Sequence, residues 1–105
     1  MFIDLQRDQQ SELAETFGLL SDPTRLSIVL SCMDLEVSAG DIANKLGLSP
    51  SLVSHHLRLL RSARIVRSER RGKHVFYTMT DACVRDVITT MINHLFVHDY
   101  SDKDN

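Results

Sequence analysis

Apolar residues recur at intervals of three and four along most of the chain, and this spacing predicts amphipathic helices. The first two helices are expected over about residues 8–20 and 23–33. Between them, Asp22 is suited to cap the second helix and Pro23 to begin it. The apolar faces of these two helices consist of Leu13, Phe17, Leu20, Leu26, Val29, Leu30 and Met33.

Residues 39–62 have the pattern of a helix-turn-helix unit. A short helix is expected over about 39–46, and Gly47 can end it because glycine tolerates a positive φ. Ser49 is suited to cap a second helix that starts at Pro50 and ends near residue 62. The inward face of this second helix is predicted to hold Leu52, Val53, His56, Leu57 and Leu60.

The opposite face of that second helix is polar and basic, with Ser51, Ser54, His55, Arg58 and Arg61. Short donors near a helix start can reach base edges in the major groove, and arginine can reach phosphate or guanine. We therefore predict a DNA-recognition helix, to which Ser49 also contributes. The alternative is an ordinary surface helix whose polar side faces water.

Past residue 62 the apolar period changes from helical spacing to alternation. Two strands are predicted over about 65–70 and 74–79, joined by a turn at residues 71–73. Arg70, Arg71 and Lys73 surround this turn. A basic hairpin directly after a recognition helix is typical of a wing, whose tip meets the DNA backbone or minor groove. The alternative is a plain hairpin with a soluble tip.

The final helix is predicted over about 81–98, with Thr80 as its N-cap and Asp81 in its first turn. Its broad apolar stripe consists of Val84, Val87, Ile88, Met91, Ile92, Leu95 and Phe96. This stripe is wider than the core of so small a domain requires, so we expect it to join two copies of the chain. Residues 100–105 are polar and are expected to fray.

The charge is concentrated rather than evenly spread. Residues 58–74 hold seven basic side chains and one acidic side chain, a net charge of +6, in a chain whose net charge is −2. The rest holds five basic and thirteen acidic side chains, a net charge of −8. A basic face on an acidic body favours binding to phosphate.

Composition adds limits on the class of protein. The length of 105 residues fits one domain, which we expect to span 1–105 and to be mostly α with a small β-hairpin. No apolar run could cross a membrane, no signal peptide opens the chain, and Cys32 and Cys83 form no CxxC pair, so we expect a cytoplasmic protein with reduced thiols. No set of nucleophile, base and orienting residue indicates an enzyme. A winged helix that binds only protein remains an alternative.

Four segments together resemble the ArsR/SmtB group of bacterial transcriptional repressors. They are Leu20–Leu26, Asp41–Ala43, Leu48–Leu60 and Arg71–Tyr77, and they include the sequences Val-Ser-His-His-Leu and Arg-Gly-Lys. The resemblance implies a winged helix-turn-helix homodimer joined by its first and last helices. It also implies that Ser51, Ser54 and His55 contact operator DNA, and that an inducer relieves repression.

Members of this group sense divalent metals at several places, of which only the last helix offers suitable residues here. The resemblance implies ligands Asp81 and Cys83 from one subunit, with His94 from the other. His98 stands beside Val97, where the fourth ligand is expected. Such a set suits tetrahedral Zn²⁺, with Co²⁺, Ni²⁺ or Cd²⁺ as alternatives. Asp99 or Asp102 could also complete it.

The alternative for the last helix is structural. Asp81 then caps the helix, Cys83 packs, and the two histidines are surface side chains. In that case the repressor responds to a different inducer or to none.

Overall fold

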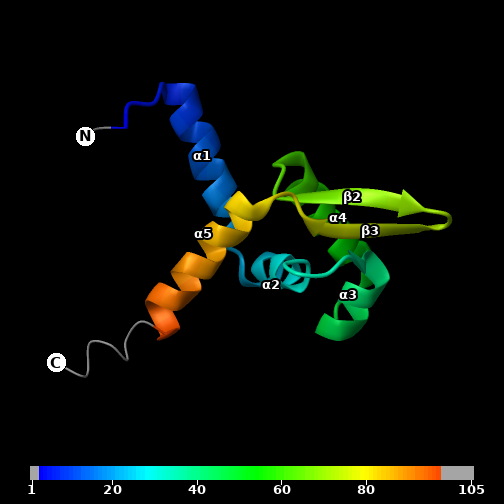
Figure 1. The fold of residues 1–105 in the computed structure, drawn as a ribbon. Coiled ribbons are helices and arrows are strands. Elements are labelled where there is room, and N and C mark those ends of the chain that lie inside the picture. Colours follow the sequence, from blue (N-terminus) through cyan, green and yellow to red (C-terminus); the bar gives the residue numbers. More distant parts are fainter. Residues whose placement is uncertain (1–2, 98–105) are drawn as a thin grey trace.

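The computed structural model of the protein describes residues 3–97, which fold into helices and one small antiparallel sheet (Figure 1). In chain order the elements are α1 (Arg7–Leu20), α2 (Pro23–Ser31), β1 (Val37–Ser38), α3 (Ala39–Leu46), α4 (Pro50–Ser62), β2 (Val66–Arg71), β3 (His74–Met79), α5 (Ala82–Ile92) and the π-helical turn η1 (Asn93–Val97). The prediction of a mostly α, winged helix-turn-helix fold is confirmed.

Side-chain caps begin the central helices where the sequence predicted them. The Asp22 carboxylate accepts a hydrogen bond from the Arg25 backbone N–H at 2.8 Å, which starts α2. The Ser49 hydroxyl accepts one from the Leu52 N–H at 3.2 Å, which starts α4. Such caps satisfy N–H groups that have no partner inside the helix.

Two left-handed glycines make the sharp turns of the DNA-binding unit. Gly47 has a φ of 68° and ends α3, and its N–H donates to the Ala43 carbonyl. Gly72 has a φ of 64° at the tip of the β2–β3 hairpin. The hairpin turn is one residue shorter than predicted, because Arg71 still pairs with His74 as part of β2.

The strand β1 was not predicted. Val37 pairs with Tyr77 and Ser38 with Phe76, so the sheet order is β1-β3-β2. Two residues are too few to show alternation, and this segment was interpreted as a connection. The extra strand fixes the base of the hairpin to the start of α3.

One apolar core joins α2, α3, α4, the hairpin and α5. Its fully or nearly fully buried members are Ile28, Val29, Cys32, Ile42, Ala43, Val53, Leu57, Leu60, Ile65, Val66, Met79 and Ile88. Two predictions were wrong, since Leu30 and Leu52 are 43% and 39% exposed. On α2, Ile28 fills the position that had been assigned to Leu30.

The helix α5 starts later and ends earlier than predicted. Asp81 is its N-cap, and its carboxylate accepts from the N–H groups of Cys83 and Val84 at 3.0 and 3.3 Å. Thr80 was therefore wrongly predicted as the cap. The regular α-helix ends at Ile92 and continues as the π-helical turn η1. His98 and the tail that was expected to fray lie outside the described residues.

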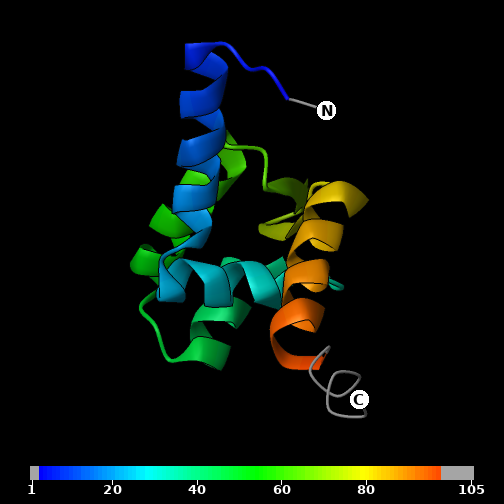
Figure 2. The ribbon, with the colours of Figure 1, turned by 90° about the vertical axis from the view of Figure 1, so that its left-hand side faces the viewer.

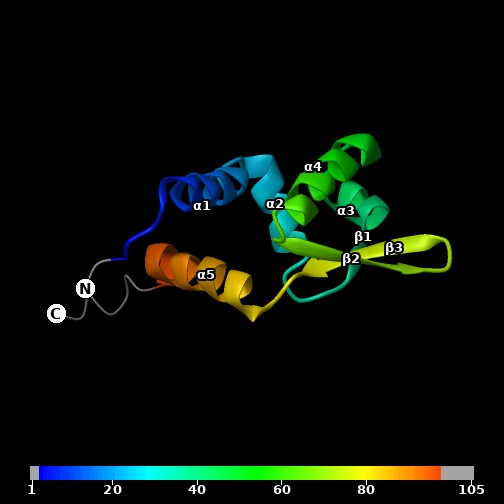
Figure 3. The same ribbon diagram turned by 90° about the horizontal axis from the view of Figure 1, so that it is seen from above.

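The helices α1 and α5 lie at the end of the molecule opposite the hairpin tip, as Figures 1 and 3 agree. Figure 2 looks onto this end, where the two helices stand on either side of α2. Large apolar side chains are exposed on both helices and on η1, which follows α5: Leu13, Phe17, Val87, Met91, Leu95 and Phe96. No helix among residues 3–97 is long and apolar enough to cross a membrane.

Candidate nucleic-acid interface

The helix α4 presents the predicted recognition face to solvent. Ser51, His55 and Arg58 are exposed, and Ser54 is half-buried beside them. The Ser49 oxygen is engaged as the helix cap, but its hydroxyl hydrogen remains available to a phosphate oxygen. The N-terminus of α4 thus offers hydroxyl and imidazole groups where a helix start favours anions.

The β2–β3 hairpin is tied to the end of α4. The Arg61 Nη1 donates to the Ser68 hydroxyl at 3.2 Å, which links the last turn of α4 to β2. The recognition helix and the hairpin therefore form one unit. They share the basic segment of the chain.

The two arginines at the hairpin end lie on opposite faces of the sheet, because side chains alternate along a strand. Arg70 is exposed, and its Nη1 donates a long bond of 3.5 Å to the Gly72 carbonyl. Arg71 instead donates to the Glu36 carboxylate and lies 3.5 Å from that of Glu69. The hydrogen bond to Glu36, and then that to Glu69, raises the pKa of Arg71, so its guanidinium stays charged.

Lys73 occupies the hairpin turn and is exposed. Within residues 3–97, neither Lys73 nor Arg58 forms an ion pair with a carboxylate, and Arg61, which donates to Ser68, forms none either. These side chains, with Arg70, are cations of the predicted interface that are open to a phosphate.

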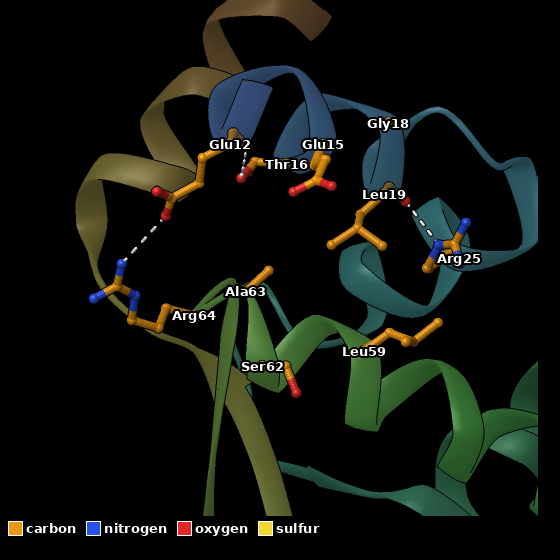
Figure 4. A pocket seen from close by; sticks show the side chains of 10 residues that line it. All are labelled: Glu12, Glu15, Thr16, Gly18, Leu19, Arg25, Leu59, Ser62, Ala63 and Arg64. Carbon is orange, nitrogen blue, oxygen red and sulfur yellow. Dashed lines mark hydrogen bonds and ion pairs between the residues drawn. The ribbon is translucent and has the colours of Figure 1, made fainter. Parts of the chain in front are cut away.

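A hollow of about 530 Å³ separates α1 from the end of α4 (Figure 4). Two contacts at its rim hold α1 in place. The Arg64 guanidinium lies 3.7 Å from the Glu12 carboxylate, and the Arg25 Nε donates to the Leu19 carbonyl at 2.9 Å. Since Arg64 follows α4 and Arg25 lies on α2, α1 contacts both α2 and the loop that follows the predicted recognition helix.

His56 lies on the inner side of α4, toward α2. Its Nδ1 is fully buried and has no hydrogen-bond partner among the described residues. Burial, and then the charge of Arg25, lowers the pKa of His56, while Asp22 acts in the opposite direction. The fold therefore favours the neutral imidazole at the joint between α2 and α4. The predicted inward position of His56 is confirmed.

We expect acid to weaken this joint. The unfolded chain has a histidine pKa of about 6.5 and binds the proton more tightly than the folded chain, so the free energy of unfolding rises with pH in this window. The contribution of His56 is complete above about pH 6.5 and is lost as the pH falls toward its lowered pKa. Urea unfolding at pH 7.5 and 5.5 measures it.

The matched variants for that experiment are His56→Gln and His55→Gln. The first is expected to flatten the dependence of stability on pH. The second changes the exposed neighbour on the same helix, which is only the last of the four influences on the pKa of His56, and is expected to leave most of the dependence in place. An unchanged dependence in His56→Gln would contradict the assignment.

The predicted metal ligands lie at opposite ends of the last helix. Asp81 and Cys83 are at its start, and His94 is in the π-helical turn. Eleven residues separate Cys83 from His94, which corresponds to about 16 Å along an α-helix. No three potential ligands come together within residues 3–97 of one chain. A shared metal site would therefore need a second subunit.

The two thiols differ in reactivity. Cys32 is fully buried in the core, and burial raises its pKa to about 11. Cys83 is exposed at the start of α5. Only the second can act as a ligand without unfolding, because a metal binds the thiolate.

Comparisons with known proteins agree with this geometry. The sequence model described as "Bacterial regulatory protein, arsR family" matches residues 22–68. Over 88 residues the chain is 38% identical to the transcriptional repressor SmtB homolog of Synechocystis sp., covering 84% of this chain and 67% of that protein. It is 36% identical to the cadmium resistance transcriptional regulatory protein CadC homolog of Staphylococcus aureus, covering 87% and 76%.

Solved structures share the fold. The homodimeric winged helix-turn-helix DNA-binding domain of Mb0332 from Mycobacterium bovis superposes with a TM-score of 0.77 at 20% identity, covering 93% of this chain and 95% of that one. A recognition helix beside a basic wing, on a chain with these relatives, is the DNA-binding unit of a regulator and not an enzyme. The chain belongs to the arsR family of bacterial regulatory proteins.

Proposed function

We propose that this protein represses transcription by binding operator DNA in the cytoplasm as a homodimer, and that an inducer at α5 releases it. The observation that carries the DNA-binding part is the exposed face of α4 beside an open basic hairpin tip. Ser51, Ser54 and His55 would contact base edges, while Arg58, Arg70 and Lys73 would contact phosphates. Ser49, Arg61 and Arg71 complete the residues predicted from the sequence.

The dimer is supported by the apolar side chains left exposed at one end of the molecule. Val87 and Met91 on α5 and Leu95 on η1 are each more than half exposed, and Phe17 on α1 is 55% exposed. Exposed apolar patches of this kind mark protein interfaces. A homodimeric domain of the same fold supports the same arrangement. Two subunits would place two recognition helices on successive major grooves.

The inducer we favour is a divalent metal, most simply Zn²⁺. Asp81 uses one carboxylate oxygen as the cap of α5, and within residues 3–97 its other oxygen accepts no hydrogen bond. Cys83 is exposed beside it. If the partner's α5 runs antiparallel, its His94 end comes beside this pair, and carboxylate, thiolate and imidazole suit zinc. A relative concerned with cadmium resistance supports metal sensing.

The identity of the fourth metal ligand depends on the residues at the end of the last helix. His94 and His98 would share a face of an α-helix, where residues four apart are neighbours. The described residues end within the π-helical turn Asn93–Val97, and His98 lies outside them. The fourth ligand is therefore proposed from the sequence alone, as His98, Asp99 or Asp102.

Release would be a shift between two arrangements of the dimer. The arrangement without metal spaces the recognition helices for DNA, and a crosslink between the paired α5 helices favours another spacing. If the metal binds one arrangement more tightly than the other by a few kcal/mol, the affinity for operator DNA can change about 100-fold. The residues of this chain bind the ion and transmit its effect through the packing of α5 on the core at Val84 and Ile88.

Zinc is expected to release the wild-type dimer from DNA of its own upstream promoter. Fluorescence anisotropy of the labelled duplex follows release as zinc is added. Cys83→Ser and His94→Ala are expected to stay bound, because each removes one ligand. His74→Ala, which alters an exposed histidine of the hairpin, controls for general zinc binding.

If zinc, and then Co²⁺, Ni²⁺ and Cd²⁺, leave the wild type bound, the inducer is not a metal at α5. The alternative is a repressor of the same family that responds to an organic or thiol-reactive compound, or to none. Failure to bind any duplex at low salt would instead support a protein-interaction module.

A further inference from the structure

A single arginine side chain reaches from the tip end of the hairpin across the sheet. Arg71 is the last residue of β2, and its guanidinium lies 5.0 Å from the centre of the Phe76 ring on β3. It also donates to Glu36, the residue just before β1, and lies 3.5 Å from Glu69 on its own strand. One guanidinium therefore joins residues of all three strand segments.

The strand register explains how these groups meet. Glu69 stands two residues before Arg71 on the same face of β2, and Phe76 pairs with Glu69 across the hairpin. Ser38 of β1 pairs with Phe76 on the other side of β3, which brings Glu36 to the same face. Figure 3 shows β1 beside the base of the hairpin.

The charges around Arg71 make this face a poor site for a phosphate. Two carboxylates surround one guanidinium, so the cluster of Glu36, Glu69 and Arg71 carries a net charge of −1. A phosphate approaching Arg71 would have to displace a carboxylate and would be repelled by the other. Arg70 and Lys73 have no such competitors within residues 3–97.

The contacts of Arg71 also stabilise the outer part of the hairpin. A two-stranded hairpin is only marginally stable by itself and must be held by neighbouring structure. Beyond Ser38 the outer part of the hairpin has no third strand. The link to Glu36 connects its outer residues to the segment that follows α2 and the core.

We propose that Arg71 is a positioning residue, which sets the angle of the hairpin relative to α4 through Glu36 and Glu69 and does not contact DNA. Arg70 and Lys73 at the tip then meet the backbone. This inference rests on the DNA-binding part of the proposed function and is independent of the inducer. It reassigns one of the three basic residues that the hairpin pattern had placed at the DNA.

Glu36→Gln separates the two roles. If Arg71 contacted phosphate, removal of a competing carboxylate would strengthen binding or leave it unchanged. If Arg71 positions the hairpin, loss of the ion pair weakens binding by up to about five-fold, the upper end of the range for an exposed ion pair. Anisotropy with a labelled duplex of the protein's own upstream DNA measures the affinity.

The dependence of affinity on salt gives a second readout. Arg70→Ala, the matched variant on the opposite face, is expected to lower the slope of log affinity against log salt by about 0.9, the value for one phosphate contact. Arg71→Ala is expected to weaken binding with an unchanged slope. A slope that falls with Arg71→Ala would overturn the proposal.

Hydrogen exchange of the hairpin amides keeps the test independent of DNA. In the protein alone, Glu36→Gln and Arg71→Ala are expected to speed exchange in residues 69–76 by about five-fold, and Arg70→Ala is expected to leave it unchanged. If the wild type binds no duplex at low salt, the proposed function fails while this measurement still decides the positioning role. Unchanged exchange in Glu36→Gln would exclude it.

Discussion

Replacement of Met91 by glutamate is expected to separate the dimer and to lower operator affinity by about 100-fold, because binding through two linked sites gains a factor of this size or more. Met91 lies in the middle of the apolar stripe of α5 and is 54% exposed in the single chain. In a dimer it would be buried, and a carboxylate there would lose its water without gaining a partner. The single chain would remain folded, since Met91 is not part of its core.

Sedimentation equilibrium gives the mass of the particle, and anisotropy gives the DNA affinity. Thr89→Glu adds the same charge on the polar side of α5 and is expected to leave both unchanged. A Met91→Glu protein that stays dimeric would exclude this stripe as the interface. A monomer with wild-type affinity would show that dimerisation does not support DNA binding.

Leu57→Ala is expected to lower the free energy of unfolding by about 3 kcal/mol, a large part of the 5–15 kcal/mol that holds a typical domain together. Leu57 lies on the buried face of α4 and has none of its surface exposed. Removing its branched end leaves a cavity between α4 and its neighbours in the core. Urea unfolding at one fixed protein concentration measures the loss, since dimerisation makes stability depend on concentration.

Leu52→Ala is the matched change on the same helix. The sequence pattern placed Leu52 and Leu57 on one buried face, whereas the structure leaves Leu52 39% exposed. We therefore expect Leu52→Ala to cost less than about 1 kcal/mol. Equal losses in the two variants would favour the pattern over the structure.

The parts of the fold that could be predicted are those with local causes. Asp22, Ser38 and Ser49 cap helices through their own side chains, and Gly47 ends α3 through its own backbone. The helix-turn-helix unit follows from these residues alone. Alternation over six residues was long enough to define β2 and β3.

The parts that could not be predicted depend on distant contacts. The strand β1 forms because Val37 pairs with Tyr77, which lies forty residues further along the chain. A segment of two residues has no pattern from which that pairing could be predicted. Leu52 and Leu57 satisfy the same helical spacing, but only the packing of α2 and the hairpin decides which one is covered. The two carboxylate partners of Arg71 come from the fold in the same way.

The candidate metal site shows a further limit. Its residue types were identified by resemblance to a family, and one chain separates them along α5. A second subunit that faces them is a property of an assembly, which neither residue spacing nor a single chain defines. The exposed apolar stripe is the part of that assembly visible in the sequence.

The short loop between α4 and β2 contains a residue in an unfavourable backbone conformation. Arg64 has a φ of 62°, a left-handed conformation that costs a residue with a side chain about 1 kcal/mol or more. Glycine would remove this cost, but it would also remove the exposed ion pair with Glu12 on α1. Because exposed ion pairs are weak, Arg64→Gly would exchange a backbone cost for the loss of a small contact between α1 and the loop after α4.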